Sequence, residues 1–214
     1  MHPLILGAGL LAAALIGPSA AARCPPPGAA VAEHFIAADC ADCWARGDTP
    51  PVAWRFDWVL PAGADAPLSA ASLGEAAERQ QRLGKQSASR AAAPRPGMLL
   101  KVGSGPAWQG YFGVQMTFKP SARQALPTGA SAWLALVELL PAGSEGNAAP
   151  RALLRAVAGP LPLHSATPGQ AITPITHLRA LRWPEGAKPE RLQARGWIEA
   201  ADGRLLAVAA DRCP

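Results

Sequence analysis

Short segments in which apolar and polar residues alternate run through most of the chain, and they predict β-strands. The period of two is clearest in Val52–Leu60, where Trp54, Phe56 and Trp58 fall on one face. A shorter apolar run, Val31–Ala37, indicates a buried strand. After residue 97, evenly spaced apolar runs separated by Pro and Gly predict an antiparallel β-sandwich. These runs are Met98–Val102, Tyr111–Phe118, Ala132–Leu140, Leu153–Val157, His177–Trp183, Leu192–Ile198 and Leu205–Ala210.

One segment has the helical period instead. Ser69–Leu83 carries a narrow apolar face formed by Leu73, Ala76, Ala77, Gln80 and Leu83. Ser72 with Glu75 fits a capping box, and Gly84 fits a C-terminal stop. The following stretch, 85–97, is rich in Ser, Ala, Arg and Pro and is typical of a linker.

The N-terminus has the pattern of a secretory signal peptide over residues 1–22. Its apolar run, Leu4–Ile16, is too short to cross a bilayer core of about 30 Å. Ala20 and Ala22 satisfy an A-x-A cleavage rule, which predicts a mature start near Arg23 and no membrane span after cleavage. An uncleaved anchor is the minor alternative. We therefore expect a secreted or periplasmic protein.

Composition excludes one class of partner. The formal charge of +5 is spread along the chain without a block of like charges. A nucleic-acid-binding protein would show a basic stripe or cluster. We therefore expect no nucleic-acid partner, and we interpret the high pI as an arginine-rich composition.

The four cysteines, at 24, 40, 43 and 213, are expected to form two disulfides in an oxidising compartment. Three connectivities exist, and the closeness of Cys40 and Cys43 favours a local pair. Cys24 and Cys213 are then left for a structural disulfide joining the two ends of the mature chain. Zinc is the rival use of four thiols, but there is no second C-x-x-C and no nearby His pair, so we expect neither metal nor cofactor.

The sequence Cys40-Ala-Asp-Cys43 at the end of a predicted strand is typical of a redox dithiol, with Cys40 as the attacking and Cys43 as the resolving thiol. Asp39 and Asp42 flank Cys40, and carboxylates oppose a thiolate. Arg46 and His34 are the nearby offsets in sequence. His34 approaches the dithiol only if its side chain points to the same face, and a solvated strand histidine is the favoured expectation. A static structural disulfide is therefore the stronger interpretation, and redox catalysis the weaker one.

Seven tryptophans raise the question of ligand binding. Those on predicted strands are expected in the core, because aromatic residues usually fill a sandwich interior. The loop that holds Trp108 and Tyr111 is the exception, and these two residues are our ligand-contact candidates. No hydrolase or phosphate-binding motif is present.

Several of these pieces together resemble a family of secreted bacterial proteins of uncharacterised function, the DUF1223 family. The matching pieces are Cys40–Cys43, Phe56–Trp58, the predicted helix, and Leu136–Asn147 followed by the arginines Arg151 and Arg155. The resemblance implies a thioredoxin-like N-terminal half and a β-rich C-terminal half. A full helix after the second cysteine and a proline beside the dithiol are missing, so the resemblance implies location and fold more than activity.

The expected fold class is α+β, with a reduced thioredoxin-like unit at 23–97 followed by an antiparallel β-sandwich at 98–214. The expected function is that of a secreted or periplasmic binding or interaction module. The alternative is a weak periplasmic thiol–disulfide oxidoreductase that uses Cys40 and Cys43. The expected partner is a protein or a thiol or disulfide substrate in the cell envelope.

Overall fold

The computed structural model describes residues 30–46, 54–84, 89–92, 97–121, 125–163, 173–183 and 185–212. The predicted signal peptide at 1–22 and the cysteines Cys24 and Cys213 lie outside these residues. Ten strands dominate the described part of the chain, together with two short α-helices and two short 3₁₀ helices.

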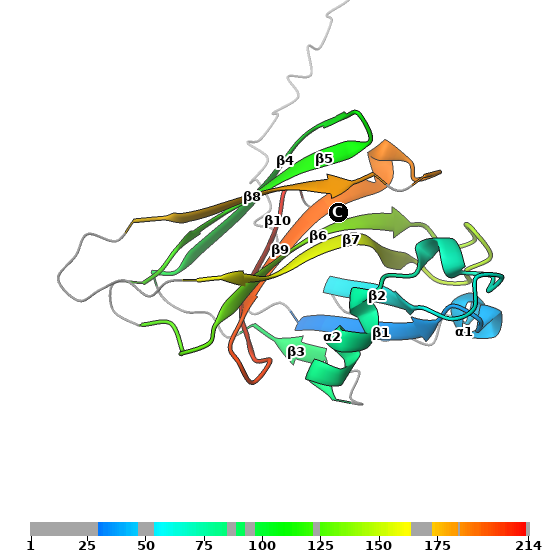
Figure 1. The fold of residues 1–214 in the computed structure, drawn as a ribbon, viewed down its shortest axis with the longest axis horizontal. Coiled ribbons are helices and arrows are strands. Elements are labelled where there is room, and N and C mark those ends of the chain that lie inside the picture. The colour runs from blue at the N-terminus through cyan, green and yellow to red at the C-terminus, as the bar shows by residue number, and fades with distance from the viewer. Residues whose placement is uncertain are drawn as a thin grey trace, which may run out of the picture.

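Seven strands form one mixed sheet in the order β10-β9-β6-β7-β2-β1-β3 (Figure 1). The pairs β1–β2 and β2–β7 are parallel, and the other pairs are antiparallel. A parallel pair needs a crossover between its strands, and α1 (Ala41–Ala45) lies in the crossover from β1 to β2. The bounds are β1 Ala30–Ala37, β2 Trp54–Leu60, β3 Ser89–Ala91, β6 Ser131–Leu140, β7 Arg151–Pro162, β9 Leu192–Glu199 and β10 Leu205–Ala210.

Three strands form a second, antiparallel sheet in the order β4-β5-β8: β4 is Leu99–Trp108, β5 is Tyr111–Lys119 and β8 is Ile175–Arg182. Every second residue of β5 points inward, and Val114, Met116 and Phe118 are fully buried. They pack in one core with apolar residues of β6 and β9, including Leu134 and Ile198. Figure 1 shows this sheet as the upper layer of the molecule.

The larger sheet is strongly curled, and α2 (Glu75–Leu83) fills its inner side. Arg79 of α2 binds Glu33 of β1 at 2.6 Å and Glu199 of β9 at 2.6 Å. In a flat sheet these strands, four positions apart, would be separated by about 19 Å. A single guanidinium contacts both carboxylates because the sheet curls around the helix.

The charges inside this curled sheet are paired. Arg90 of β3 also contacts Glu33 and Glu199. Burial lowers the pKa of Arg90, an effect that the carboxylate of Glu199 opposes. The indole N–H groups of Trp58 and Trp133 donate to Glu33 at 3.0 Å and to Glu199 at 2.9 Å. We call this set of residues, with Arg79, the buried ion cluster.

A smaller core lies beneath α1. Ile36, Trp44 and Val59 pack together there, and residues beside the 3₁₀ helix Ser69–Ala71 contact them. A second 3₁₀ helix, Pro189–Arg191, leads into β9. The crossover segment is thus fixed to the sheet by a core of its own.

The predicted fold class is wrong. The protein is mostly β, and a single mixed sheet contains strands from both sides of residue 97, so there is no separate α+β thioredoxin-like unit. The predicted helix is also shorter. It begins at Glu75, its N-cap is Gly74, and the Ser72 hydroxyl donates to the Ser69 carbonyl instead of capping it.

Candidate functional site

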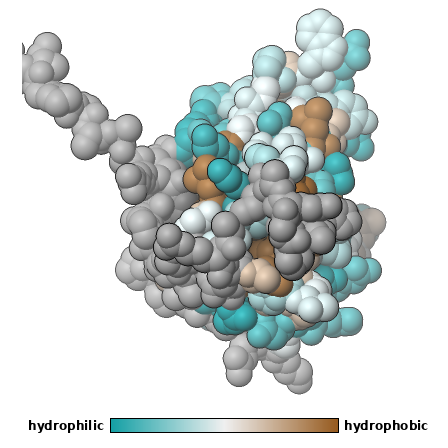
Figure 2. Space-filling model, turned by 90° about the vertical axis from the view of Figure 1, so that its left-hand side faces the viewer, coloured by the Kyte–Doolittle hydropathy of each residue, from teal (hydrophilic) through white to brown (hydrophobic). Residues whose placement is uncertain are grey.

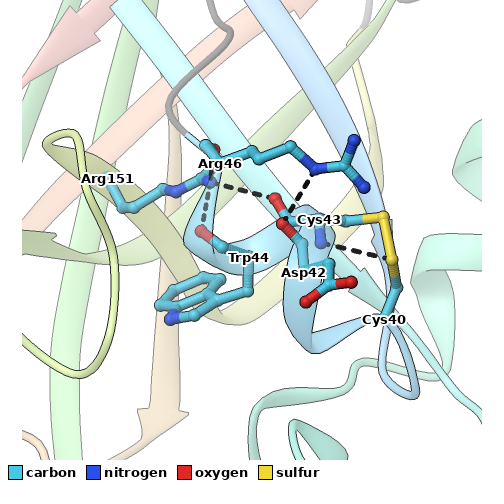
Figure 3. Close-up of a disulfide and its surroundings, with 6 residues drawn as sticks. All are labelled: Cys40, Asp42, Cys43, Trp44, Arg46 and Arg151. Carbon is cyan, nitrogen blue, oxygen red and sulfur yellow. Dashed lines mark hydrogen bonds between the residues drawn. A yellow bond between two sulfur atoms is a disulfide. The ribbon is translucent and has the colours of Figure 1, made fainter.

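The two predicted redox cysteines form a disulfide at the end of β1. Cys40 is the N-cap of α1, and its Sγ accepts a hydrogen bond of 3.2 Å from the backbone N–H of Cys43 (Figure 3). Cys43 is exposed and Cys40 is half-buried. Cys43, which we expected to be the resolving thiol, is therefore the more exposed residue of the pair.

Arg151, at the start of β7, fixes the far end of α1 (Figure 3). Its Nη2 donates to the carbonyls of Cys43 at 3.2 Å and Arg46 at 2.6 Å, and also to that of Trp44. Its guanidinium carbon lies 5.2 Å from the centre of the Trp44 ring. The disulfide turn is therefore anchored to the sheet by one buried cation.

Asp57 lies behind Arg151 and is completely buried. Its carboxylate accepts hydrogen bonds from Arg55 Nε at 2.6 Å and from the backbone N–H of Ala152 at 2.9 Å, and it lies 3.5 Å from Arg151 Nη1. His34 Nδ1 is 3.3 Å from the same carboxylate. His34 thus contacts Asp57 and is half-buried, whereas a solvated strand histidine was the favoured expectation and a place beside the dithiol the other one.

The hairpin between β4 and β5 carries the two predicted ligand-contact residues. Trp108 and Tyr111 stand opposite each other across the two-residue turn and are 74% and 50% exposed. The turn residues Gln109 and Gly110 have φ values of 48° and 79°, as a tight hairpin requires. Among the described residues, these are the exposed large aromatic side chains.

Trp183, which directly follows β8, holds the hairpin in place. The backbone N–H of Trp183 donates to the Gly110 carbonyl at 2.7 Å, and its indole N–H donates to the Ala187 carbonyl at 3.2 Å. The Trp183 and Phe112 ring centres lie 5.7 Å apart. Trp108 and Tyr111 are therefore displayed on a fixed turn.

The strand register places further exposed residues on the same side as these aromatic rings. Tyr111 pairs with Arg182, Gln115 with Gly103 and Leu178, and Thr117 with Lys101 and Thr176. We call this side of the three-stranded sheet the outer face. It consists of Leu99, Lys101, Gly103, Trp108, Tyr111, Gly113, Gln115, Thr117, Lys119, Thr176, Leu178, Ala180 and Arg182.

Other sequence expectations fall as follows. Trp54, Trp58, Trp133 and Trp197 are buried, as predicted for strand tryptophans. The Cys24–Cys213 pair lies outside the described residues and stays a prediction. Within the part that the structure describes, no three His, Cys, Asp or Glu side chains gather as metal ligands. No helix there has the length and apolar character of a membrane span.

Sequence reasoning missed two features of these sites. Arg151 entered only as part of the family resemblance, because its partners on α1 are more than a hundred positions away. The cations Lys101, Lys119 and Arg182 were interpreted as scattered charge. Only the pairing of β4, β5 and β8 brings them to one face.

No protein-family model and no curated protein matches this chain. Among solved structures, the chain is similar to HBP35 of Porphyromonas gingivalis, with a TM-score of 0.51 and 9% sequence identity. The match covers 87% of this chain and 75% of that one. At this identity the likeness concerns the fold alone.

Proposed function

We propose that this protein is a secreted or periplasmic binding module that contacts its partner through the outer face of the three-stranded sheet. The observation that carries the proposal is the pair of exposed rings, Trp108 and Tyr111, on a braced hairpin. Tryptophan and tyrosine are enriched where proteins contact partners, because they bury much area with few rotatable bonds. The N-terminal apolar run and the Cys40–Cys43 disulfide support export.

The exposure of Trp108 to water has an energetic cost in the free protein. Burying an aromatic side chain stabilises a protein by about 2–3 kcal/mol, which exposed Trp108 gives up in the free protein. The other tryptophans on β-strands are buried. A partner that covers Trp108 and Tyr111 recovers this free energy as binding affinity.

The experiment is a panel of immobilised neutral and acidic glycans, peptides and lipid vesicles, probed with wild type, Trp108→Ala and Tyr111→Ala. Arg204→Ala, an exposed residue on the β9–β10 turn, serves as the control. We expect at least one probe to be bound by wild type and the control but lost with both aromatic variants. If every bound probe is retained by Trp108→Ala, or none is bound, the proposal is wrong.

A second candidate function is thiol–disulfide exchange, which the exposure of Cys43 favours. A substrate thiolate attacks Cys43 Sγ, the Cys40–Cys43 bond breaks, and Cys40 leaves as a thiolate that accepts the Cys43 N–H. A second substrate thiolate then attacks the substrate sulfur of the mixed disulfide and releases Cys43. Two electrons pass from the substrate dithiol to the protein.

The reduction potential separates this function from a structural disulfide. A potential below about −300 mV is typical of a structural disulfide, and a higher one of an exchanging pair. If exchange is the function, wild type catalyses insulin reduction by dithiothreitol, and Cys43→Ser abolishes the activity. Equal rates for wild type and Cys43→Ser would exclude it.

A further inference from the structure

The outer face carries cations and no carboxylate. Lys101, Lys119 and Arg182 project from it, and none of β4, β5 and β8 contains Asp or Glu. Within the described segments, the carboxylate that hydrogen-bonds to these strands is that of Asp211, which accepts from Ser104, and Ser104 stands opposite the buried Val114. The charge of the outer face therefore favours an anionic ligand.

Neutral polar groups lie between the cations and the aromatic rings. Gln115 Nε2 lies 3.4 Å from Thr117 Oγ1, which lies 3.4 Å from Thr176 Oγ1. These long contacts leave amide and hydroxyl groups ready to pair with a ligand. From Tyr111 to Thr117 the face extends about 20 Å, which is long enough for a chain of several sugar rings.

The form of the surface distinguishes among anionic polymers. An extended peptide can bind by adding to a sheet edge through backbone hydrogen bonds, whereas the groups named here are side chains that stand on the flat face of the sheet. A membrane surface needs a broad apolar patch. Figure 2 shows, at the left-hand end of the molecule, apolar residues as separate patches among hydrophilic ones. On the outer face, Leu99 and Leu178 are separated by Gln115 and Thr117 in the register.

We propose that the outer face binds an acidic polysaccharide. Sugar rings stack on Trp108 and Tyr111, carboxylate or sulfate groups pair with Lys101, Lys119 and Arg182, and hydroxyl groups pair with the central amide and hydroxyls. An aromatic ring suits this task because its flat apolar face carries a partial negative charge, which attracts the C–H groups of a sugar. This inference rests on the proposed binding function and names its ligand class.

The test compares two probes that differ only in charge: a hexamer of 1,4-linked galacturonic acid and its fully methyl-esterified form. We expect calorimetry on the mature protein to give at least tenfold tighter binding of the acid than of the ester. The double variant Lys101→Gln/Lys119→Gln reduces this preference, because Arg182 is the only one of the three cations left, and Trp108→Ala weakens both probes at least tenfold. The affinity for the acid falls roughly tenfold between 50 and 200 mM salt, as expected when about three cations are engaged.

The control is Arg46→Gln/Arg204→Gln, which removes the same net charge from exposed sites outside the three-stranded sheet and should leave both affinities unchanged. If wild type binds the acid and the ester with equal affinity and Trp108→Ala binds neither, the acidic-ligand inference is wrong but the outer face remains the binding surface. Binding to phosphatidylglycerol vesicles, lost with Trp108→Ala, without binding to the hexamer would assign the face to a membrane. Failure of Trp108→Ala to weaken any probe overturns the proposed function itself.

Discussion

The inside of the curled sheet and the outer face of the three-stranded sheet use the same residue types in opposite ways. Inside, Arg79 is bound by two carboxylates, and Trp58 and Trp133 donate their N–H groups to the same carboxylates. On the outer face, the cations stand on strands without acidic residues, and Trp108 is 74% exposed. The difference teaches that the charged groups of the buried ion cluster pair with one another, whereas the cations of the outer face stand on strands that offer them no carboxylate.

The largest expected effect comes from breaking the buried ion cluster. Arg79→Leu leaves Glu33 and Glu199 buried with Arg90 as their remaining cation. Removing one partner of a buried ion pair costs about 3–5 kcal/mol in the free energy of unfolding. Urea unfolding should show the loss as a lower midpoint at an unchanged slope.

Arg204→Leu is the matched control because Arg204 is exposed on a turn and should change stability by less than about 0.5 kcal/mol. A comparable effect of the two substitutions would show that the interior does not depend on paired charge.

A smaller loss is expected at the disulfide end, where Arg151 connects α1 to the sheet. Arg151→Met removes hydrogen bonds to the carbonyls of Cys43, Trp44 and Arg46 and a cation beside Asp57. We expect a loss of about 2–3 kcal/mol. Hydrogen exchange should become faster at residues 41–46, while amides in β5 stay protected; unchanged exchange at 41–46 would contradict this role.

Removing the disulfide should cost less. The Cys40–Cys43 bond closes a very short loop, and the chain-entropy model gives about 2 kcal/mol for it. Thermal unfolding of Cys40→Ser/Cys43→Ser against wild type measures the difference. Binding by the outer face should be unchanged, and its loss with the disulfide would show that the disulfide turn and the outer face are coupled.

The smallest change in stability is expected on the outer face. Trp108→Ala should alter the free energy of unfolding by less than about 0.5 kcal/mol, because the side chain makes little contact with the fold. A loss above 2 kcal/mol would show that Trp108 is a structural residue. By contrast, Trp197→Ala, at a buried tryptophan inside the curled sheet, should lower the free energy of unfolding by about 3–5 kcal/mol.

The individual strands were predictable because each carries a local period of two or an apolar run bounded by Pro and Gly. Their arrangement was not, because the parallel pairing of Asp57 with Leu153 joins distant segments. The strand Ser89–Ala91 lies in the predicted linker and forms by pairing with the edge of β1. Its sequence alone gives no strand pattern.

The candidate sites were likewise predictable only where they depend on residues close together in the sequence. The local pairing of Cys40 with Cys43 and the exposure of Trp108 and Tyr111 follow from short segments, and the structure shows both. Arg79 lies on the predicted helix, but its burial depends on Glu33 and Glu199 from distant strands. The cations of the outer face likewise meet only through strand pairing.

The most direct measurement is a map of ligand contact by NMR, in which the galacturonic acid hexamer is titrated into ¹⁵N-labelled protein. We predict that the amide shifts cluster in β4, β5 and β8, with the largest at the Trp108–Tyr111 hairpin, and that Lys101→Gln/Lys119→Gln needs a higher hexamer concentration to give the same shifts. Shifts confined to α1 and the disulfide turn would contradict the outer face as the binding surface, and no shifts at all would contradict an acidic polysaccharide as its ligand.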